Sequence, residues 1–205
     1  VNKTTVTEET MPDAIITGVL ADGNHYRVNW NTSVPQMVDR VEILRETSRY
    51  NEFEVVATLP VSQGSWLDTT SDNRIQTQRY RIRLLANNNI QTSTFSETHK
   101  PLHVTIYKSA TKGYSLVWNA YEGMDIESYR ILRGTSTDNL TQIAEVAGSL
   151  QNYTDISAPA GTCLYAIAYV PASTQQLAES CAMRSNTSNA YMLSNAVSTA
   201  EAIEA

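Results

Sequence analysis

The chain carries one sequence pattern twice. Tyr26 to Trp30 reads YRVNW, and 88 residues later Tyr114 to Trp118 reads YSLVW. Three further blocks recur in the same order, at offsets of 88, 87 and 85 residues: those that begin at Val38, Trp66 and Tyr80 match those that begin at Ile126, Tyr153 and Tyr165. Such ordered self-similarity predicts one structural unit of about 90 residues built twice.

Apolar and polar residues alternate within each block. In the first block Tyr26, Val28 and Trp30 fall on one face of an extended chain, and Arg27 and Asn29 fall on the other. A period of two with one polar face is typical of half-buried antiparallel strands. Turn-forming residues separate the blocks, at 21–24, 60–64, 87–89 and 158–161. Several short strands per unit predict a β-sandwich.

Four aromatic residues are expected to mark the cores of the two units: Trp30, Trp118, Tyr80 and Tyr165. A side chain that spans two sheets roughly 10 Å apart must be large, and an indole meets that need. We therefore interpret the two tryptophans as core residues and not as platforms for a ligand.

With these residues in place, the sequence resembles a tandem pair of fibronectin type III modules. That family has a Trp in its second strand, an aromatic-x-aliphatic third strand and a later Tyr-x-aliphatic strand. The second unit supplies Trp118, Tyr129-Arg-Ile131 and Tyr165-Ala-Ile167, whereas the first has Val41 at the aromatic position. The resemblance covers about residues 11–199. It implies an all-β fold of two consecutive immunoglobulin-like (fibronectin type III) antiparallel β-sandwiches.

The stretch from Tyr129 to Asp155 further resembles modules of secreted bacterial polysaccharide-utilisation and cell-surface proteins. This resemblance implies a place outside the cytoplasm, secreted or on the cell surface. Anchoring as an outer-membrane lipoprotein is one form of that placement, with any signal upstream of Val1. It also implies adhesion, spacing or contact with protein or carbohydrate, and no catalysis.

We expect an N-terminal extension over 1–10, a first domain over 11–100, a second over 101–199 and a C-terminal tail over 200–205. The second domain contains a long insertion over 172–189. The boundary, near Thr98 to Leu102, is short, and Pro101 restricts the residue before it to extended geometry. These features predict a semi-rigid elongated pair of domains.

The two cysteines, Cys163 and Cys181, leave two interpretations open. Cys163 shares the inward parity of Tyr165, and Cys181 lies in the insertion. A disulfide would pin the insertion to the sandwich and add ~3 kcal/mol of stability in the chain-entropy model. The alternative is two buried free thiols.

Charge and motifs exclude several function classes. The formal net charge of −6 and the pI near 5.1 argue against a nucleic-acid partner. No apolar run approaches the roughly 18 residues of a membrane span. Catalytic motifs and a calcium-loop spacing are missing, so we expect neither an enzyme nor a cofactor. Asp68 and Asp155 are expected to cap turns.

The histidines are expected to be solvated. His99 and His103 flank Pro101 in an extended segment, which would place them about 13 Å apart and too far for one zinc ion. We therefore interpret both as solvent-exposed residues of the segment that joins the two domains.

The favoured function is a non-catalytic extracellular module: an adhesion, spacer or protein-interaction part of a secreted or surface-anchored bacterial protein, expected to be monomeric. The alternative is a carbohydrate-binding accessory module of a polysaccharide-processing system. Candidate contacts for a protein or glycan are Tyr121, Met124, Met183 and Tyr191, with Tyr50 as a further glycan candidate.

Overall fold

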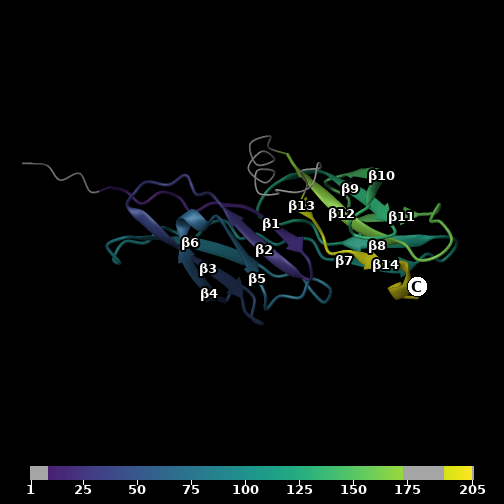
Figure 1. Cartoon of the computed structure of the whole chain (residues 1–205), viewed down its shortest axis with the longest axis horizontal. Helices are drawn as coiled ribbons and strands as arrows, with labels where there is room; N and C mark the ends of the chain where they lie inside the picture. Colours follow the sequence, from purple (N-terminus) through teal and green to yellow (C-terminus); the bar gives the residue numbers. More distant parts are fainter. Residues whose placement is uncertain (1–8, 173–191, 205) are drawn as a thin grey trace, which may run out of the picture.

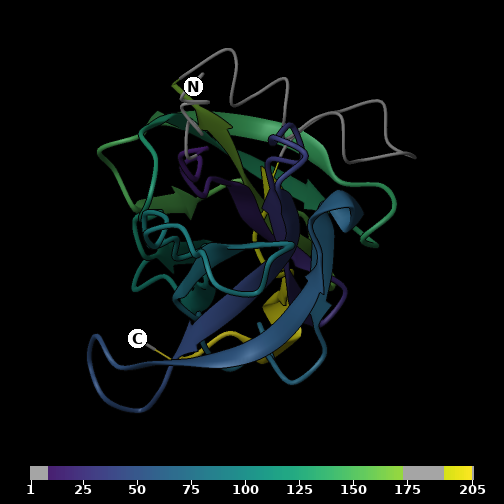
Figure 2. The ribbon, with the colours of Figure 1, turned by 90° about the vertical axis from the view of Figure 1, so that its left-hand side faces the viewer.

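The computed structural model describes residues 9–172 and 192–204, and over these residues the protein is all-β. Figure 1 shows two sandwiches arranged end to end along the long axis, and Figure 2 looks along that axis from the side of the first sandwich. The chain therefore builds two consecutive immunoglobulin-like, fibronectin type III-like antiparallel β-sandwiches, as predicted.

The first sandwich consists of two three-stranded sheets with the orders β1-β2-β5 and β4-β3-β6. Every paired strand in it is antiparallel. The strands are β1 (Ile16–Asp22), β2 (His25–Trp30), β3 (Val38–Glu46), β4 (Phe53–Pro60), β5 (Ser65–Asp68) and β6 (Tyr80–Ala86), with a 3-10 turn over Val61–Gln63.

The second sandwich repeats this order as β7-β8-β11 and β10-β9-β12, and β13 and β14 both pair with β12. Its strands are β7 (Val104–Lys108), β8 (Tyr114–Trp118), β9 (Ile126–Gly134), β10 (Thr141–Ala147), β11 (Asn152–Asp155), β12 (Leu164–Pro171), β13 (Met192–Leu193) and β14 (Val197–Ser198). A 3-10 turn over Thr199–Glu201 follows. The final segment is tied back, because Ile203 forms a parallel bridge with Tyr107 of β7.

Each sandwich has its own core, and the signature residues lie in it. Trp30 is 2% exposed and Trp118 is 4% exposed, while Tyr80 and Tyr165 are fully buried. The indole N–H of Trp30 donates to the carbonyl oxygen of Val61 at 2.8 Å, which closes the first core over its 3-10 turn. The four side chains that the alternation predicted to point inward are therefore buried.

The two units also share a buried triad of arginine, aspartate and tyrosine. In the first, the Tyr80 hydroxyl donates to Asp68 Oδ2 at 2.6 Å, and Arg45 Nη1 donates to the same oxygen at 2.8 Å. The second repeats this with Tyr165 and Arg133 on Asp155 Oδ2, at 2.5 and 2.7 Å. Each triad links strands of both sheets.

The predicted turn caps are confirmed at both aspartates. The backbone N–H of Thr70 donates to Asp68 Oδ1 at 3.2 Å, and that of Ser157 donates to Asp155 Oδ1 at 3.0 Å. Burial alone would raise the pKa of Asp68, but hydrogen bonds from Tyr80, Thr70 and Arg45 outweigh it and hold the pKa below its usual value. The carboxylate therefore stays charged.

Candidate functional site

The junction between the sandwiches is built around the outer edge of β1. This strand ends its sheet, so backbone groups on one side lack a strand partner. The N–H of Val19 donates to the Tyr121 hydroxyl oxygen at 3.0 Å, and the Tyr169 hydroxyl donates to the Val19 carbonyl at 2.5 Å. Two tyrosines of the second sandwich thus satisfy both backbone groups of Val19 at the edge of the first.

His99 extends this network in the linking segment. Its Nδ1 lies 2.6 Å from the Tyr121 hydroxyl, and the two rings meet edge to face with centroids 5.5 Å apart. Because Val19 donates to the Tyr121 oxygen, the tyrosine proton is free to bond Nδ1, which requires a neutral imidazole. Burial lowers the pKa of His99 to about 4, against the opposing charge of Glu122.

His99 is 3% exposed, so the prediction of a solvated histidine is wrong at this position. The segment passes between two packed bodies and does not run through solvent. Backbone bonds hold it on both sides: His99 pairs with Tyr80 of the first sandwich, and Lys100 pairs with Glu122 of the second. His103, in contrast, is only half-buried.

Apolar and steric contacts complete the junction. Leu20 of β1 belongs to the core cluster of the second sandwich. The Tyr26 hydroxyl donates to the Leu102 carbonyl at 3.0 Å. Gly123 packs so closely on the linking segment that an added Cβ would lie 2.5 Å from His99 Cδ2 and 2.7 Å from the Thr98 carbonyl oxygen. Only glycine fits there without displacement.

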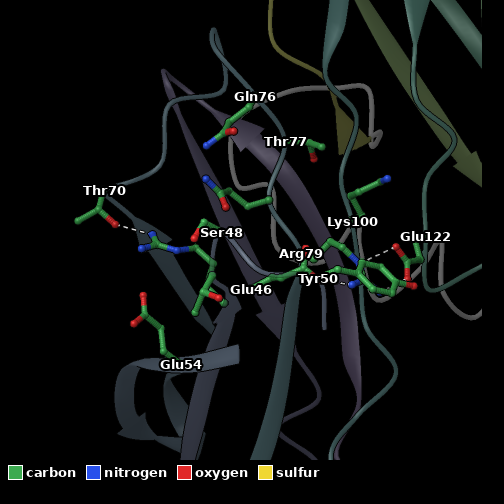
Figure 3. A pocket seen from close by; sticks show the side chains of 13 residues that line it. Glu46, Ser48, Tyr50, Glu54, Thr70, Gln76, Thr77, Arg79, Lys100 and Glu122 are labelled. Carbon is green, nitrogen blue, oxygen red and sulfur yellow. Dashed lines mark hydrogen bonds and ion pairs between the residues drawn. The ribbon is translucent and has the colours of Figure 1, made fainter. Parts of the chain in front are cut away.

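A polar groove of about 1100 Å³ opens beside the junction, with walls from both sandwiches (Figure 3). Arg79 lies at its centre and binds Glu122 through two hydrogen bonds of 2.8 and 3.0 Å. The same guanidinium bonds Glu46 and, at 2.9 Å, Asn51 Oδ1. Its bonds with Glu122 raise the pKa of Arg79 above its usual value, so the cation is permanent.

Tyr50 is the exposed aromatic residue of this groove. The residue is 79% exposed, and the Arg79 guanidinium carbon lies 5.2 Å from the ring centroid. Lys100, Glu54 and Gln76 add charged and amide groups to the lining. A ring beside amide, hydroxyl and charged groups can stack on and hydrogen-bond a polar ligand.

The residues predicted as external contacts fare differently. Tyr121 is 7% exposed because it is buried in the junction, so it does not lie at the surface as a contact for a protein or glycan would. Met124 is half-buried and packs against the second core. Met183 and Tyr191 lie outside the described residues.

The disulfide stays a prediction. Cys163 is 3% exposed, with its backbone N–H bonded to Thr199 Oγ1 at 3.1 Å, and Cys181 lies outside the described residues.

Two searches for other chemistry are negative within the part of the chain that the structure describes. No group of three or more histidine, cysteine, aspartate or glutamate side chains is placed to hold a metal ion. No helix there has the length and apolar character needed to cross a membrane.

Comparison with known proteins gives no family model and no curated relative that match the chain. Among solved structures, the chicken interferon gamma receptor alpha chain overlaps at a TM-score of 0.37 and 12% identity, over 79% of this chain and 91% of that one. A two-domain fibronectin type III segment of chicken tenascin overlaps at a TM-score of 0.30 and 14% identity, over 93% of this chain and 97% of that one. The FN1-FN3 domains of chicken CNTN1 overlap at a TM-score of 0.29 and 12% identity, over 80% of this chain and 61% of that one. The strand order of the chain itself, repeated in both units, identifies the fold.

Proposed function

We propose that this chain is a non-catalytic extracellular interaction module that serves as a rigid spacer in an adhesive or surface protein. The junction is the single observation that carries the proposal. Tyr121 and Tyr169 bond one residue of the first sandwich, and His99 is buried between the units. A floppy tether needs none of these contacts, whereas a spacer that fixes distance and direction does.

The bacterial surface setting of the proposal is supported by the sequence resemblance described above. The net charge of −6 and the lack of catalytic motifs in the sequence agree with it. Anchoring of the parent protein, as a lipoprotein or otherwise, belongs to the same proposal.

Small-angle X-ray scattering of two glycine variants tests the spacer. Gly123 and Gly161 both have positive φ angles, +109° and +88°, so an alanine is strained at either. Only at Gly123 does the new Cβ strike the linking segment, since nothing lies within 4 Å of a Cβ at Gly161. We expect Gly123→Ala to shorten and broaden the distance distribution, and Gly161→Ala to reproduce the wild-type curve.

Identical scattering from both variants, with both sandwiches folded by circular dichroism, would mean that the junction does not set the domain arrangement. The spacer proposal would then lose its support.

Carbohydrate binding is the second candidate, and the groove at Tyr50 favours it. The 79% exposed ring beside a groove of about 1100 Å³ lined by amide and hydroxyl groups is suited to a sugar. A glycan array tests this candidate. Binding that is lost in Tyr50→Ala and kept in Tyr153→Ala supports it, and an array without any binding rejects it.

A further inference from the structure

Six side chains form an alternating ladder on the outer face of the β4-β3-β6 sheet. They are Tyr50, Arg79, Phe53, Arg81, Phe95 and Arg83, here called the ladder. Arg81 lies at its centre, with the guanidinium carbon 4.2 Å from the Phe53 ring centroid and 3.8 Å from that of Phe95. Arg81 and Arg83 alternate along β6 with core residues and so point outward, and Arg79 directly precedes the strand.

Two neighbouring serines attach the segment that carries Phe95 to β6. Ser93 Oγ accepts a hydrogen bond from the Leu84 N–H at 2.8 Å, and Ser96 Oγ accepts one from the Ile82 N–H at 2.9 Å. These hydroxyls attach the segment around Phe95 to the edge of β6. The backbone that carries Phe95, one of the two rings on either side of Arg81, is therefore held beside β6 before any partner binds.

Charge is balanced along the ladder except at its centre. Arg79 pairs with Glu46 and Glu122, and Arg83 pairs with Glu42 at 2.6 Å. Within residues 9–172 and 192–204, Arg81 contacts no carboxylate, and its Nε is buried without a hydrogen-bond partner. Burial, followed by the charges of Arg83 and Arg79, lowers the pKa of Arg81. A half-buried cation in this setting is a strong site for an anion.

Apolar groups surround this cation. Val55, Leu44 and Arg81 lie side by side on three adjacent strands. Leu44, on the middle strand, is 6% exposed, whereas Val55 is 50% exposed and Phe95 is 41% exposed. Arginine and aromatic side chains on an apolar base are the composition of the energetic centre of protein interfaces.

We propose that this face binds a protein segment in which an aspartate or glutamate carboxylate is flanked by apolar side chains. The carboxylate pairs with the guanidinium of Arg81, which itself lies between the two phenyl rings. The flanking side chains contact Val55 and Phe95. A protein segment is favoured over a phosphate group because only one of the three arginines is unpaired. The inference names a partner class for the interaction module proposed above. The face shares Tyr50 and Arg79 with the groove, but Arg81, the residue that would bind the carboxylate, does not line the groove.

The second sandwich provides an internal control. At the offset of 85 residues that relates Tyr80 to Tyr165, Ala166 and Ala168 take the positions of Arg81 and Arg83. Both alanines are buried, so that sandwich has no cation at the centre of the matching face. A segment that recognises the ladder should leave β12 unaffected.

Nuclear magnetic resonance titration of the full chain tests the proposal. The probes are acetyl-Leu-Glu-Leu-amide and its Gln counterpart, with the Nε–Hε resonance of Arg81 and the amides of β3, β4 and β6 as reporters. We expect saturable shifts there with the Glu peptide and at least roughly tenfold weaker binding of the Gln peptide, because a charge-assisted hydrogen bond is lost. The amides of β12 should not shift.

Two variants separate recognition at Arg81 from general attraction to a basic surface. Arg81→Gln should abolish the shifts, whereas Arg40→Gln, which removes a cation from the same sheet and lies outside the ladder, should keep them. Equal binding of the two peptides, equal loss in both variants or stronger shifts with inorganic phosphate would overturn the proposal.

Failure of this test is distinct from failure of the spacer. The scattering of Arg81→Gln should match the wild type in either case, because Arg81 forms no hydrogen bond or ion pair with the second sandwich among the described residues. A wild-type scattering curve also shows that the loss of binding is not a loss of fold.

Discussion

The hydroxyl of Tyr169 donates a 2.5 Å hydrogen bond to the carbonyl oxygen of Val19, which lies 150 positions earlier in the chain. Tyr121 accepts from the N–H of the same residue. One residue of an edge strand thus has both backbone groups satisfied by the neighbouring sandwich. The contact links the two units and also blocks part of an edge that could pair with another chain.

Removing either hydroxyl should destabilise the junction. Tyr169→Phe leaves the Val19 carbonyl without its partner, and Tyr121→Phe leaves both the Val19 N–H and His99 without theirs. We expect each variant to lose about 1–3 kcal/mol of unfolding free energy in urea titrations. Tyr153→Phe is the matched control, since no hydrogen bond to its hydroxyl is formed within the described residues. An equal effect in all three variants would contradict this account.

His99 should make stability depend on pH. Its pKa is about 4 in the folded protein and 6.5 as the ordinary value, so the unfolded chain binds the proton first as pH falls. Unfolding free energy should be at its full value above about pH 6.5 and fall towards pH 4, by roughly 3 kcal/mol. The pKa of about 4 already includes the opposing effect of the Glu122 charge.

Urea titrations from pH 4 to 7 measure this slope. His99→Gln keeps an acceptor for the Tyr121 hydroxyl and cannot titrate, so its slope in this window should be smaller. His103→Gln retains His99 and should behave like the wild type. A wild-type slope in His99→Gln would show that another group is responsible.

The two triads should be energetically equivalent. Asp68→Asn and Asp155→Asn each remove the carboxylate charge that pairs with the arginine and accepts from the tyrosine. We expect each to lose roughly 3 kcal/mol of unfolding free energy. Asp22, which pairs with Arg27 at the surface, is the control, because its replacement by Asn should change stability by less than about 1 kcal/mol. Thermal or urea unfolding provides the comparison, and a loss at one triad only would contradict equivalence.

The carboxylates also predict behaviour in acid. Hydrogen bonds hold the pKa of Asp68 and of Asp155 below the usual value in spite of burial. Their contribution is present above about pH 4, the ordinary pKa, and is lost as pH falls through the lower folded pKa. The acid unfolding transition of Asp68→Asn should therefore be less steep below pH 4 than that of the wild type.

The proposed disulfide is tested by counting thiols. Denatured, non-reduced protein should expose no free thiol if Cys163 and Cys181 are paired. Two free thiols would leave the alternative, in which both cysteines are reduced.

Local pattern sufficed to predict the sandwiches, because alternation and repetition are properties of short segments. Arg45, Asp68 and Tyr80 all lie in or beside matched blocks, and their counterparts recur in the second unit. The sequence did not predict that these three side chains contact one another, because that contact depends on how the two sheets pack. The turn caps, which are local, were predicted correctly.

The junction lay beyond such reasoning for a physical reason. Tyr121 resembles a loop residue and His99 a linker residue until the sandwiches are docked, because the contacts of Tyr121 with Val19 span 102 positions. The ladder was missed in the same way, because no local pattern shows that Arg79, Arg81 and Arg83 meet the rings of Phe53 and Phe95. Their spacing beside Phe95 was the available signal.

Residual dipolar couplings of the wild-type chain test the central claim, that the junction holds both sandwiches as one rigid body. Couplings from residues of β1 to β6 and of β7 to β14 should fit a single alignment tensor with equal magnitude and orientation. Two tensors of different magnitude, each fitting its own sandwich, would show that the units move independently and would contradict the account.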